Sequence, residues 1–172
     1  MTHRLGLLLL VTLAVTACAQ LTSTAPPSTV AVVAPDDAMA GTVERVVDGD
    51  TVIVEVAGER ERVRLLRIDT PEAARDGGPA ECLADAATAA LAELLPAGAP
   101  VELATDVEVR DRYGRLLAHL WANGTWVNGA MLEAGYADVI TFPPNVAHDD
   151  EVRAAVQRAR DAEAGLWDPG AC

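Results

Sequence analysis

Three β-prone segments follow one another in the chain, and each pair is separated by a turn sequence of three residues. Gly41–Val47, Thr51–Ala57 and Glu61–Asp69 are rich in Val, Leu, Ile and Arg. Asp48-Gly49-Asp50 and Gly58-Glu59-Arg60 separate them, and both favour tight turns. Apolar residues alternate with polar ones along the second segment, as in a half-buried strand. The sequence therefore predicts a three-stranded meander.

The rest of the chain adds two strands and three helices to this meander. Helical patterns are recognised by apolar residues at a spacing of three or four and by Pro or Gly after the last turn. The predicted helices are Ala80–Leu95, Val127–Ala134 and His148–Ala164, and the further predicted strands are Val101–Val109 and Leu116–Trp121. This order predicts an α+β, mainly β fold, with a five-stranded closed barrel and three helices packed on it.

The beginning of the chain has the pattern of an export signal. Residues Met1–Ala17 start with a positive charge and continue with an apolar run that ends in small residues. The apolar run is shorter than the roughly 20 residues that span a membrane. Val15-Thr16-Ala17-Cys18 resembles the lipobox of bacterial lipoproteins, which predicts lipidation of Cys18. Ala17-Cys18-Ala19 also fits ordinary signal peptidase, so both a lipoprotein on the outer face of the membrane and a secreted protein remain open.

A tether is predicted between the signal and the folded domain. Ala19–Asp37 contains 12 Ala, Ser, Thr or Pro among 19 residues and shows no amphipathic period. We therefore assign residues 1–17 to the signal, 18–38 to a disordered tether and 39–172 to the domain.

The cysteines indicate a disulfide rather than a zinc site. If Cys18 carries lipid, Cys82 and Cys172 remain as a pair in an oxidising compartment, which favours a bridge between them. The chain has no Cys-x-x-Cys, and its three histidines are scattered, so zinc ligation is not expected. His119, in the middle of a predicted strand, is expected to be packed or paired.

The charge of the chain argues against a broad nucleic-acid surface. All 13 basic residues are Arg, and they face 26 acidic residues. A chain with a net charge of −13 is repelled by nucleic acid at long range. Any binding of phosphates must therefore come from arginines gathered at one place.

Three polar clusters carry the residue types for such a site: Asp48-Gly49-Asp50, Arg64 to Glu72, and Asp111 to Arg115. Each has a structural explanation by itself, as a hairpin turn, a helix start or a set of cross-strand ion pairs. Together they supply two carboxylates for a hard cation, a further carboxylate for a water molecule, and guanidinium forks that suit a phosphate. These are the groups that phosphodiester hydrolysis needs.

In this order and spacing, the three clusters resemble the staphylococcal nuclease (thermonuclease) family. The resemblance covers about Gly41 to Asp168, including Pro143-Pro144-Asn145 and Gly165-Leu166-Trp167. It implies an OB-fold barrel that binds one Ca²⁺. The implied ligands are the carboxylates of Asp50 and Asp69 and the carbonyl of Thr70. Asp48 would support these ligands without contacting the ion itself. Separately from the resemblance, we expect the protein to be a monomer.

The same resemblance assigns the remaining site residues and the reaction. Glu72 matches the family's candidate general base, and Arg64 and Arg115 match the arginines that hold the phosphate. Tyr113 matches a tyrosine that contacts the nucleotide, and Arg112 lies beside it. The implied reaction is endonucleolytic cleavage of DNA and RNA that leaves 3′-phosphates.

Two regions depart from the family pattern. Ala73–Glu81 contains Asp76 and Glu81 where relatives are often lysine-rich, and Ile140 and Phe142 stand where tyrosines are common. Two alternatives therefore stay open beside the nuclease: a non-catalytic OB-fold binding module on the cell surface, and a structural calcium-binding lipoprotein.

We predict that the mature chain is anchored to the membrane through Cys18. A diacylglyceryl group together with an amide-linked acyl chain gives stable attachment, which a single acyl chain does not. Cell fractionation should find the wild-type protein with the membranes and the Cys18→Ala variant in the medium. Wild-type protein in the medium with Gln20 at its N-terminus would show that the chain is secreted instead.

Overall fold

A computed structural model of the 172-residue chain describes residues 31–74 and 78–172. The predicted export signal, Cys18 and the tether up to residue 30 lie outside these residues. In the part of the chain that is described, no helix is long and apolar enough to cross a membrane.

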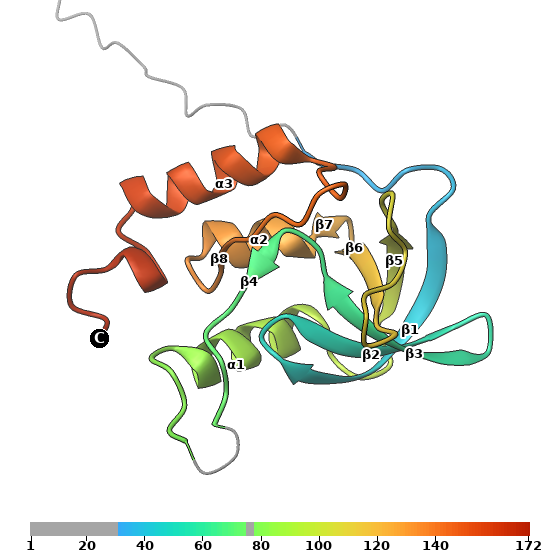
Figure 1. Ribbon diagram of the computed structural model, residues 1–172, viewed down its shortest axis with the longest axis horizontal. Coiled ribbons are helices and arrows are strands. Elements are labelled where there is room, and N and C mark those ends of the chain that lie inside the picture. Colours follow the sequence, from blue (N-terminus) through green and yellow to red (C-terminus); the bar gives the residue numbers. More distant parts are fainter. Residues whose placement is uncertain (1–30, 75–77) are drawn as a thin grey trace, which may run out of the picture. The chain divides into compact units, whose positions relative to one another are not determined.

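The described chain forms a mixed β-barrel, and this confirms the predicted fold (Figure 1). The first three strands are the predicted antiparallel meander, and the parallel pairing of β3 with β6 closes the sheet. A two-residue strand, β7, extends the sheet beyond β6. The strands are β1 (Met39–Asp48), β2 (Thr51–Val56), β3 (Glu59–Leu65), β5 (Pro100–Ala104), β6 (Leu116–Ala122) and β7 (Thr125–Trp126).

Two features of β1 allow the sheet to curve into a barrel. Its register with β2 shifts between Val43 and Arg45, and again between Val46 and Asp48. Such irregularities bend a strand and increase its twist. Asp48 then pairs with Thr51 across the expected tight turn, so the first acidic cluster lies at one end of the barrel.

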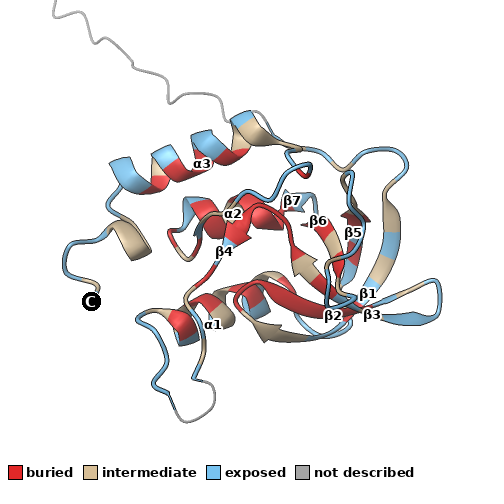
Figure 2. Ribbon diagram, viewed as in Figure 1, coloured by how far each residue is buried: buried red, intermediate tan, exposed pale blue. Residues whose placement is uncertain are grey.

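Three helices pack against the barrel, as predicted: α1 (Ala84–Leu94), α2 (Val127–Glu133) and α3 (Asp149–Asp161). Figure 1 shows α2 between α3 and the strands. A short 3₁₀ helix, η1 (Gly165–Trp167), follows α3. Figure 2 shows the buried residues gathered on β2, β6, α2 and the inward sides of α1 and α3. Trp121 is the largest of the fully buried side chains.

Three predicted element boundaries differ from the structure by four residues or more. The segment predicted as one strand to Asp69 is divided, because Arg67 adopts a left-handed conformation with φ of 64°. Beyond it, β4 (Ile68–Asp69) pairs with β8 (Asp138–Val139), a pairing that the sequence did not predict. The strand predicted to run to Val109 ends at Ala104. The first helix begins at Ala84 rather than Ala80, because Leu83 has a left-handed φ of 68°.

Contacts of the domain begin before β1. The indole Nε1 of Trp121 donates a hydrogen bond of 2.8 Å to the carbonyl of Val32. Val32 and Ala34 also pack against the core. Residues 31–34, which were assigned to the tether, therefore contact the domain that was assigned to begin at Met39.

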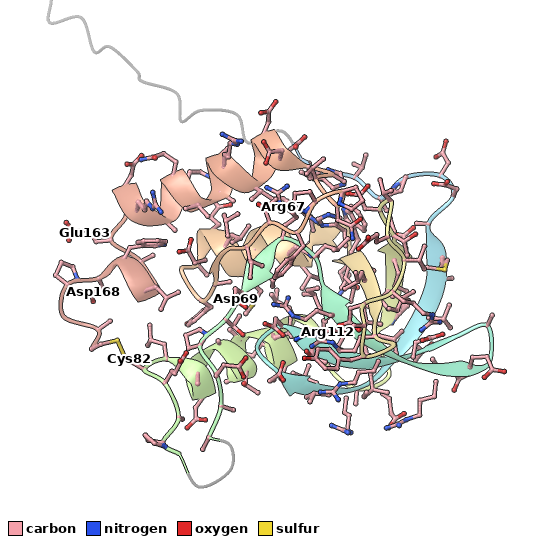
Figure 3. All side chains as sticks on the ribbon, viewed as in Figure 1. Arg67, Asp69, Cys82, Arg112, Glu163 and Asp168 are labelled. Atoms are coloured by element: carbon pink, nitrogen blue, oxygen red, sulfur yellow. A yellow bond between two sulfur atoms is a disulfide. The ribbon has the colours of Figure 1, made fainter. Side chains whose placement is uncertain are left out.

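The predicted disulfide between Cys82 and Cys172 is confirmed (Figure 3). The two Cα atoms lie 6.0 Å apart, although 90 positions separate the cysteines in the sequence. The bridge ties the C-terminal residue to the segment just before α1.

His119 is packed inside an aromatic cluster, as its position in a strand indicated. It is 2% exposed, and its ring centroid lies 4.8 Å from that of His148 and 5.7 Å from that of Trp126. Burial lowers the pKa of His119 to about 3, and His148 and Arg67 act in the same direction against Asp106. The folded protein therefore holds this imidazole neutral.

This buried histidine should make folding stability fall in mild acid. The unfolded chain protonates His119 below about pH 6.5, whereas the folded chain resists protonation down to about pH 3. The stability linked to the neutral imidazole of His119 is fully present above the pKa that this residue has in the unfolded chain, and it is lost as the pH falls towards 3. Between pH 7 and pH 5 the loss should be about 2 kcal/mol.

Urea denaturation of wild type and His119→Gln at both pH values measures this effect. The substitution will lower the free energy of unfolding at both pH values. The informative quantity is therefore how much the free energy of unfolding of each protein changes between the two pH values. Wild type should lose about 2 kcal/mol more than the variant on acidification. An identical pH dependence in the two proteins would contradict the prediction.

Candidate functional site

All three polar clusters line one cleft of about 790 Å³. It lies where the β1–β2 turn, the β3–β4 turn and the loop before β6 meet. The predicted site residues that line it are Asp48, Asp50, Arg64, Asp69, Glu72, Arg112, Tyr113 and Arg115. Thr70 is buried next to Asp50, to which its hydroxyl donates a weak hydrogen bond of 3.4 Å. The fold thus brings together residues from positions 48 to 115.

The guanidinium of Arg64 joins the two predicted metal-binding carboxylates. Its Nη2 lies 3.0 Å from Asp50 Oδ2 and 3.1 Å from Asp69 Oδ1. Its Nη1 donates hydrogen bonds to the carbonyls of Leu65 and Ile68, at 2.6 and 2.7 Å. Because β3 ends beside the β1–β2 turn, the arginine reaches both the turn that carries Asp50 and the strand that carries Asp69.

Asp50 is a buried carboxylate whose charge depends on cationic partners. It is 8% exposed, and the hydroxyl of Thr51 donates to its Oδ1 at 2.9 Å. Burial raises the pKa of Asp50 to about 6; Arg64 opposes the rise, and the nearby charge of Asp48 adds to it. The Oδ1 of Asp48 accepts a hydrogen bond of 3.3 Å from the Asp50 backbone N–H, so Asp48 also shapes the turn.

The donor set fits a hard divalent cation. Oxygens of Asp50 and Asp69 lie within 3.1 Å of the same nitrogen, so they converge on one point where positive charge is held. Calcium prefers such carboxylate oxygens together with carbonyl and water oxygens. Within residues 31–74 and 78–172, no group of three or more His, Cys, Asp or Glu side chains converges as a complete metal site. A cation here would therefore need further oxygens from the backbone, solvent or substrate.

Glu72 lies at the exposed edge of the cleft, three residues after Asp69. Two hydrogen bonds connect it with Glu81. The backbone N–H of Glu72 donates to Glu81 Oε2 at 2.9 Å, and the Glu81 N–H donates to the Glu72 carbonyl at 2.9 Å. A carboxylate in this position is accessible to water.

Arg115 is held at the cleft by Asp111. Its Nε donates to Asp111 Oδ2 at 2.6 Å, and Asp111 Oδ1 accepts from the backbone N–H groups of Tyr113 and Arg115. Burial acts to raise the pKa of Asp111, but these donors outweigh burial and hold the pKa below its usual value. Asp111 was not predicted as a site residue, although its place four residues before Arg115 could have indicated it.

Tyr113 presents an exposed aromatic ring beside two guanidinium groups. The ring is 69% exposed, with the Cζ atoms of Arg112 and Arg115 at 4.7 and 5.6 Å from its centroid. Nη2 of Arg112 also donates to the phenolic oxygen at 2.5 Å. The group therefore combines an aromatic face with positive charge.

Two buried polar residues that the sequence analysis missed support the turn between β3 and β4. Arg67, labelled in Figure 3, lies beneath α3 and is 4% exposed. Its Nη2 lies 2.5 Å from Asp149 Oδ1 at the start of α3. Asn128 in α2 donates to the Leu66 carbonyl at 2.8 Å and accepts from the Leu120 N–H at 2.9 Å. The sequence signal that could have identified them is a single arginine or asparagine within a run of apolar residues, which indicates a buried polar side chain.

The two departures at positions 140 and 142 also lie at the cleft. Ile140 and Phe142 line it, and Phe142 is 65% exposed. Asn145 joins this loop to the loop before β6, since it accepts from the Glu108 N–H at 2.7 Å and donates to the Glu108 carbonyl at 3.0 Å. One wall of the cleft is therefore apolar at the two positions where the sequence departs from the family pattern.

Comparison with known proteins shows that the chain is similar to nucleases. A family profile described as Staphylococcal nuclease homologue matches residues 62–169. The thermonuclease of Staphylococcus intermedius is 33% identical over 73% of this chain and 74% of its own length. The thermonuclease of Staphylococcus hyicus is 29% identical over 72% of each chain. Endonuclease YncB of Bacillus subtilis (strain 168) is 33% identical over 73% of this chain, which spans 60% of that protein.

Gly49 allows the β1–β2 turn to approach Thr70, and replacing it should disturb the site. A Cβ atom at Gly49 would lie 2.6 Å from Thr70 Oγ1 and 3.0 Å from the Cβ of Ala87. Gly49→Ala should therefore displace Thr70 and lower the free energy of unfolding by about 1–3 kcal/mol, a typical cost of overpacking. Urea denaturation measures the loss.

The double variant Gly49→Ala/Thr70→Ala is the matched control. Removing the Thr70 hydroxyl relieves the closest contact, so the double variant should lose less stability than the sum of the two single variants. Additive losses would show that the clash with the Thr70 hydroxyl is not the cause.

Proposed function

The chain belongs to the staphylococcal nuclease family, and we propose that it is an exported, calcium-dependent endonuclease that cleaves DNA and RNA and leaves 3′-phosphate ends. The observation that carries the proposal is the convergence of Asp50, Asp69 and Arg64 at one point, in a cleft that Glu72 and Arg115 also line. The nuclease relatives support phosphodiester hydrolysis as the reaction type.

The two carboxylates and the Thr70 carbonyl would hold the calcium ion. The bound ion would neutralise charge on the scissile phosphate. Asp50 is suited to this role because burial makes its ionised form costly without a cation beside it. Few protein groups reach the ion, so we expect a weak site, with a dissociation constant of about 10⁻⁴–10⁻³ M, as in other extracellular sites.

Glu72 is the proposed general base. Its carboxylate lies at the exposed edge of the cleft, where a water molecule can be positioned for attack on phosphorus. Glu72 would take a proton from this water as the new P–O bond forms. The bond between phosphorus and the 5′-oxygen breaks, so that the phosphate stays on the 3′-oxygen and the 5′-oxygen leaves as a hydroxyl after taking a proton from solvent. A base positioned in this way contributes about 10²–10⁴ in rate.

Arg64 and Arg115 bind the phosphate oxygens, on which negative charge increases in the transition state. Asp111 orients Arg115 through its Nε, and backbone carbonyls orient Arg64. Donors held in place before the reaction lose little energy in reorganisation, so they bind the transition state more strongly than the substrate. Removing one donor of this kind typically costs about 10²–10³ in rate.

Tyr113 and Arg112 are the proposed contacts for the adjacent nucleotide. An exposed ring accepts a base by stacking, and a guanidinium accepts a phosphate. Although the chain is strongly acidic, Arg62 and Arg110 line the same cleft and add to its local positive charge. This concentration of arginines lets an acidic protein bind a polyanion at one place.

We also propose that the nuclease acts outside the cell as a monomer anchored through Cys18. The disulfide between Cys82 and Cys172 supports an oxidising compartment. An anchored enzyme would cleave nucleic acid close to the cell surface.

We expect the purified protein to degrade single- and double-stranded DNA with Ca²⁺ and to stop in a chelator. Glu72→Gln should lower kcat at least about a hundredfold, because the amide cannot take the proton. Arg115→Ala should lower it to a similar extent through loss of a transition-state contact. Initial rates on a labelled oligonucleotide, with and without chelator, measure both effects.

Glu59→Gln and Arg60→Ala are matched controls, because both residues are exposed in the β2–β3 hairpin and neither lines the cleft. They should retain wild-type rates. Full activity in Glu72→Gln or Arg115→Ala would refute the mechanism. Binding without cleavage by wild-type protein would identify a non-catalytic OB-fold module instead.

A further inference from the structure

The segment that follows Glu72 is closed at its other end by Glu81. The two residues exchange backbone and side-chain hydrogen bonds, each of 2.9 Å, and both are exposed. Residues 75–77 between them lie outside the described part of the chain. One set of contacts that position Glu72 therefore depends on where Glu81 is held.

Glu81 is held in turn by a covalent bond at the next residue. Cys82 bridges to Cys172, and its sulfur also lies 3.5 Å from the Ala171 carbonyl. Two residues later α1 begins, and the Ala84 N–H donates to the Glu81 carbonyl at 3.2 Å. The disulfide thus lies one residue from the group that binds the Glu72 backbone.

The other half of the bridge is attached to the helical part of the domain. Residues 168–172 follow η1, and the Leu166 N–H donates to the Gly135 carbonyl at 2.8 Å. Arg160 of α3 stacks over the Trp167 ring at 4.3 Å from its centroid. Because η1 is fixed in this way to α3 and to the turn that follows α2, Cys172 connects an exposed segment at the cleft to a packed part of the fold.

We propose that Glu81 is a positioning residue for Glu72, and that the Cys82–Cys172 disulfide holds it in place, so that the oxidation state of this bridge controls cleavage. The inference rests on the proposed role of Glu72 as general base. Its structural part, the dependence of the Glu72–Glu81 contact on the disulfide, does not require catalysis.

Both cysteines are exposed, so a dithiol can reach the bridge. Exposed disulfides are the ones that exchange readily. One thiolate of the dithiol attacks a sulfur of the bridge and forms a mixed disulfide with the protein. The second thiol of the reagent then attacks this mixed disulfide, which leaves both protein cysteines as thiols and the reagent as a cyclic disulfide. The dithiol supplies the two electrons. The product has lost the tie between the Glu81 segment and the C-terminal residues.

The effect of reduction should appear in kcat. A displacement of about 1 Å in a catalytic group can cost as much as about 10²-fold in rate. We therefore expect kcat to fall at least about tenfold, while KM and the calcium requirement change less than about twofold, because Asp50, Asp69 and Arg115 are held by other contacts.

Kinetics and hydrogen exchange on the same proteins test the proposal. Wild type would be measured oxidised and after reduction with dithiothreitol and alkylation, beside Cys82→Ser/Cys172→Ser. Reduction should speed amide exchange at Glu72 and Glu81 and lower kcat, and the serine variant should match the reduced protein. Reoxidation of reduced, unalkylated protein should restore kcat.

Glu81 variants separate positioning from general stability. Glu81→Ala removes the acceptor for the Glu72 N–H and should lower kcat, whereas Glu81→Gln keeps an oxygen acceptor and should retain most of it. The effects of Glu81→Ala and of disulfide removal should be less than additive, since both act on one contact. Glu93→Gln, on the exposed side of α1, is the control for charge.

A loss of stability alone is excluded with Val156→Ala. This residue is buried in α3, so the variant is destabilised while its disulfide is intact. It should keep the wild-type kcat at temperatures well below unfolding. Unchanged exchange at Glu72 and Glu81 after reduction would overturn the inference, as would an unchanged kcat. If the oxidised wild type does not cleave at all, the proposed function fails, while the exchange data still decide the structural part.

Discussion

Arg64 forms the contacts on which the arrangement of the cleft depends. One guanidinium binds two backbone carbonyls of the β3–β4 turn and two carboxylates from separate segments. It offsets the cost of burying Asp50, whose pKa is raised even in its presence. Without this side chain, two acidic groups would lie close together at a turn with little charge compensation, and such a pair is costly when it is buried.

The barrel makes this contact possible by bringing the β3–β4 turn against other elements. The Leu66 N–H donates to the Ala118 carbonyl at 2.9 Å, and the Leu65 N–H donates to the Asp50 carbonyl at 2.9 Å. Asn128 and Asp149 then attach the same turn to α2 and α3. Four parts of the chain thus fix a few residues, which explains how Arg67 can hold a left-handed conformation there.

The charge of the protein is divided between its surface and its cleft. The chain has twice as many acidic as basic residues, 26 against 13, yet six arginines line the cleft. Acidic partners position several of them, as Asp111 does for Arg115 and Glu61 for Arg110. A guanidinium held in this way loses less conformational entropy on binding a phosphate than a solvated one. The fixed positions of these arginines can therefore compensate for the weak long-range attraction between an acidic protein and a phosphate.

The sequence by itself determined the order of the elements, the β1–β3 meander, the three helices and the residue types of the site. Turn residues, apolar periodicity and motif spacing are local properties, because each depends only on residues that are close together in the sequence. The Cys82–Cys172 pair followed from counting cysteines. The family resemblance then gave each site residue an expected role.

Only the tertiary structure decided where these residues meet and what supports them. The short β4–β8 pairing, the Arg67–Asp149 ion pair over 82 positions and the contact of Glu72 with Glu81 have no local signal. Even the start of α1 was set by Leu83, whose left-handed conformation overrides a helical pattern that extends back to Ala80. Such features depend on which distant groups closure of the barrel brings within hydrogen-bonding distance, and a buried polar group must then find its partner there.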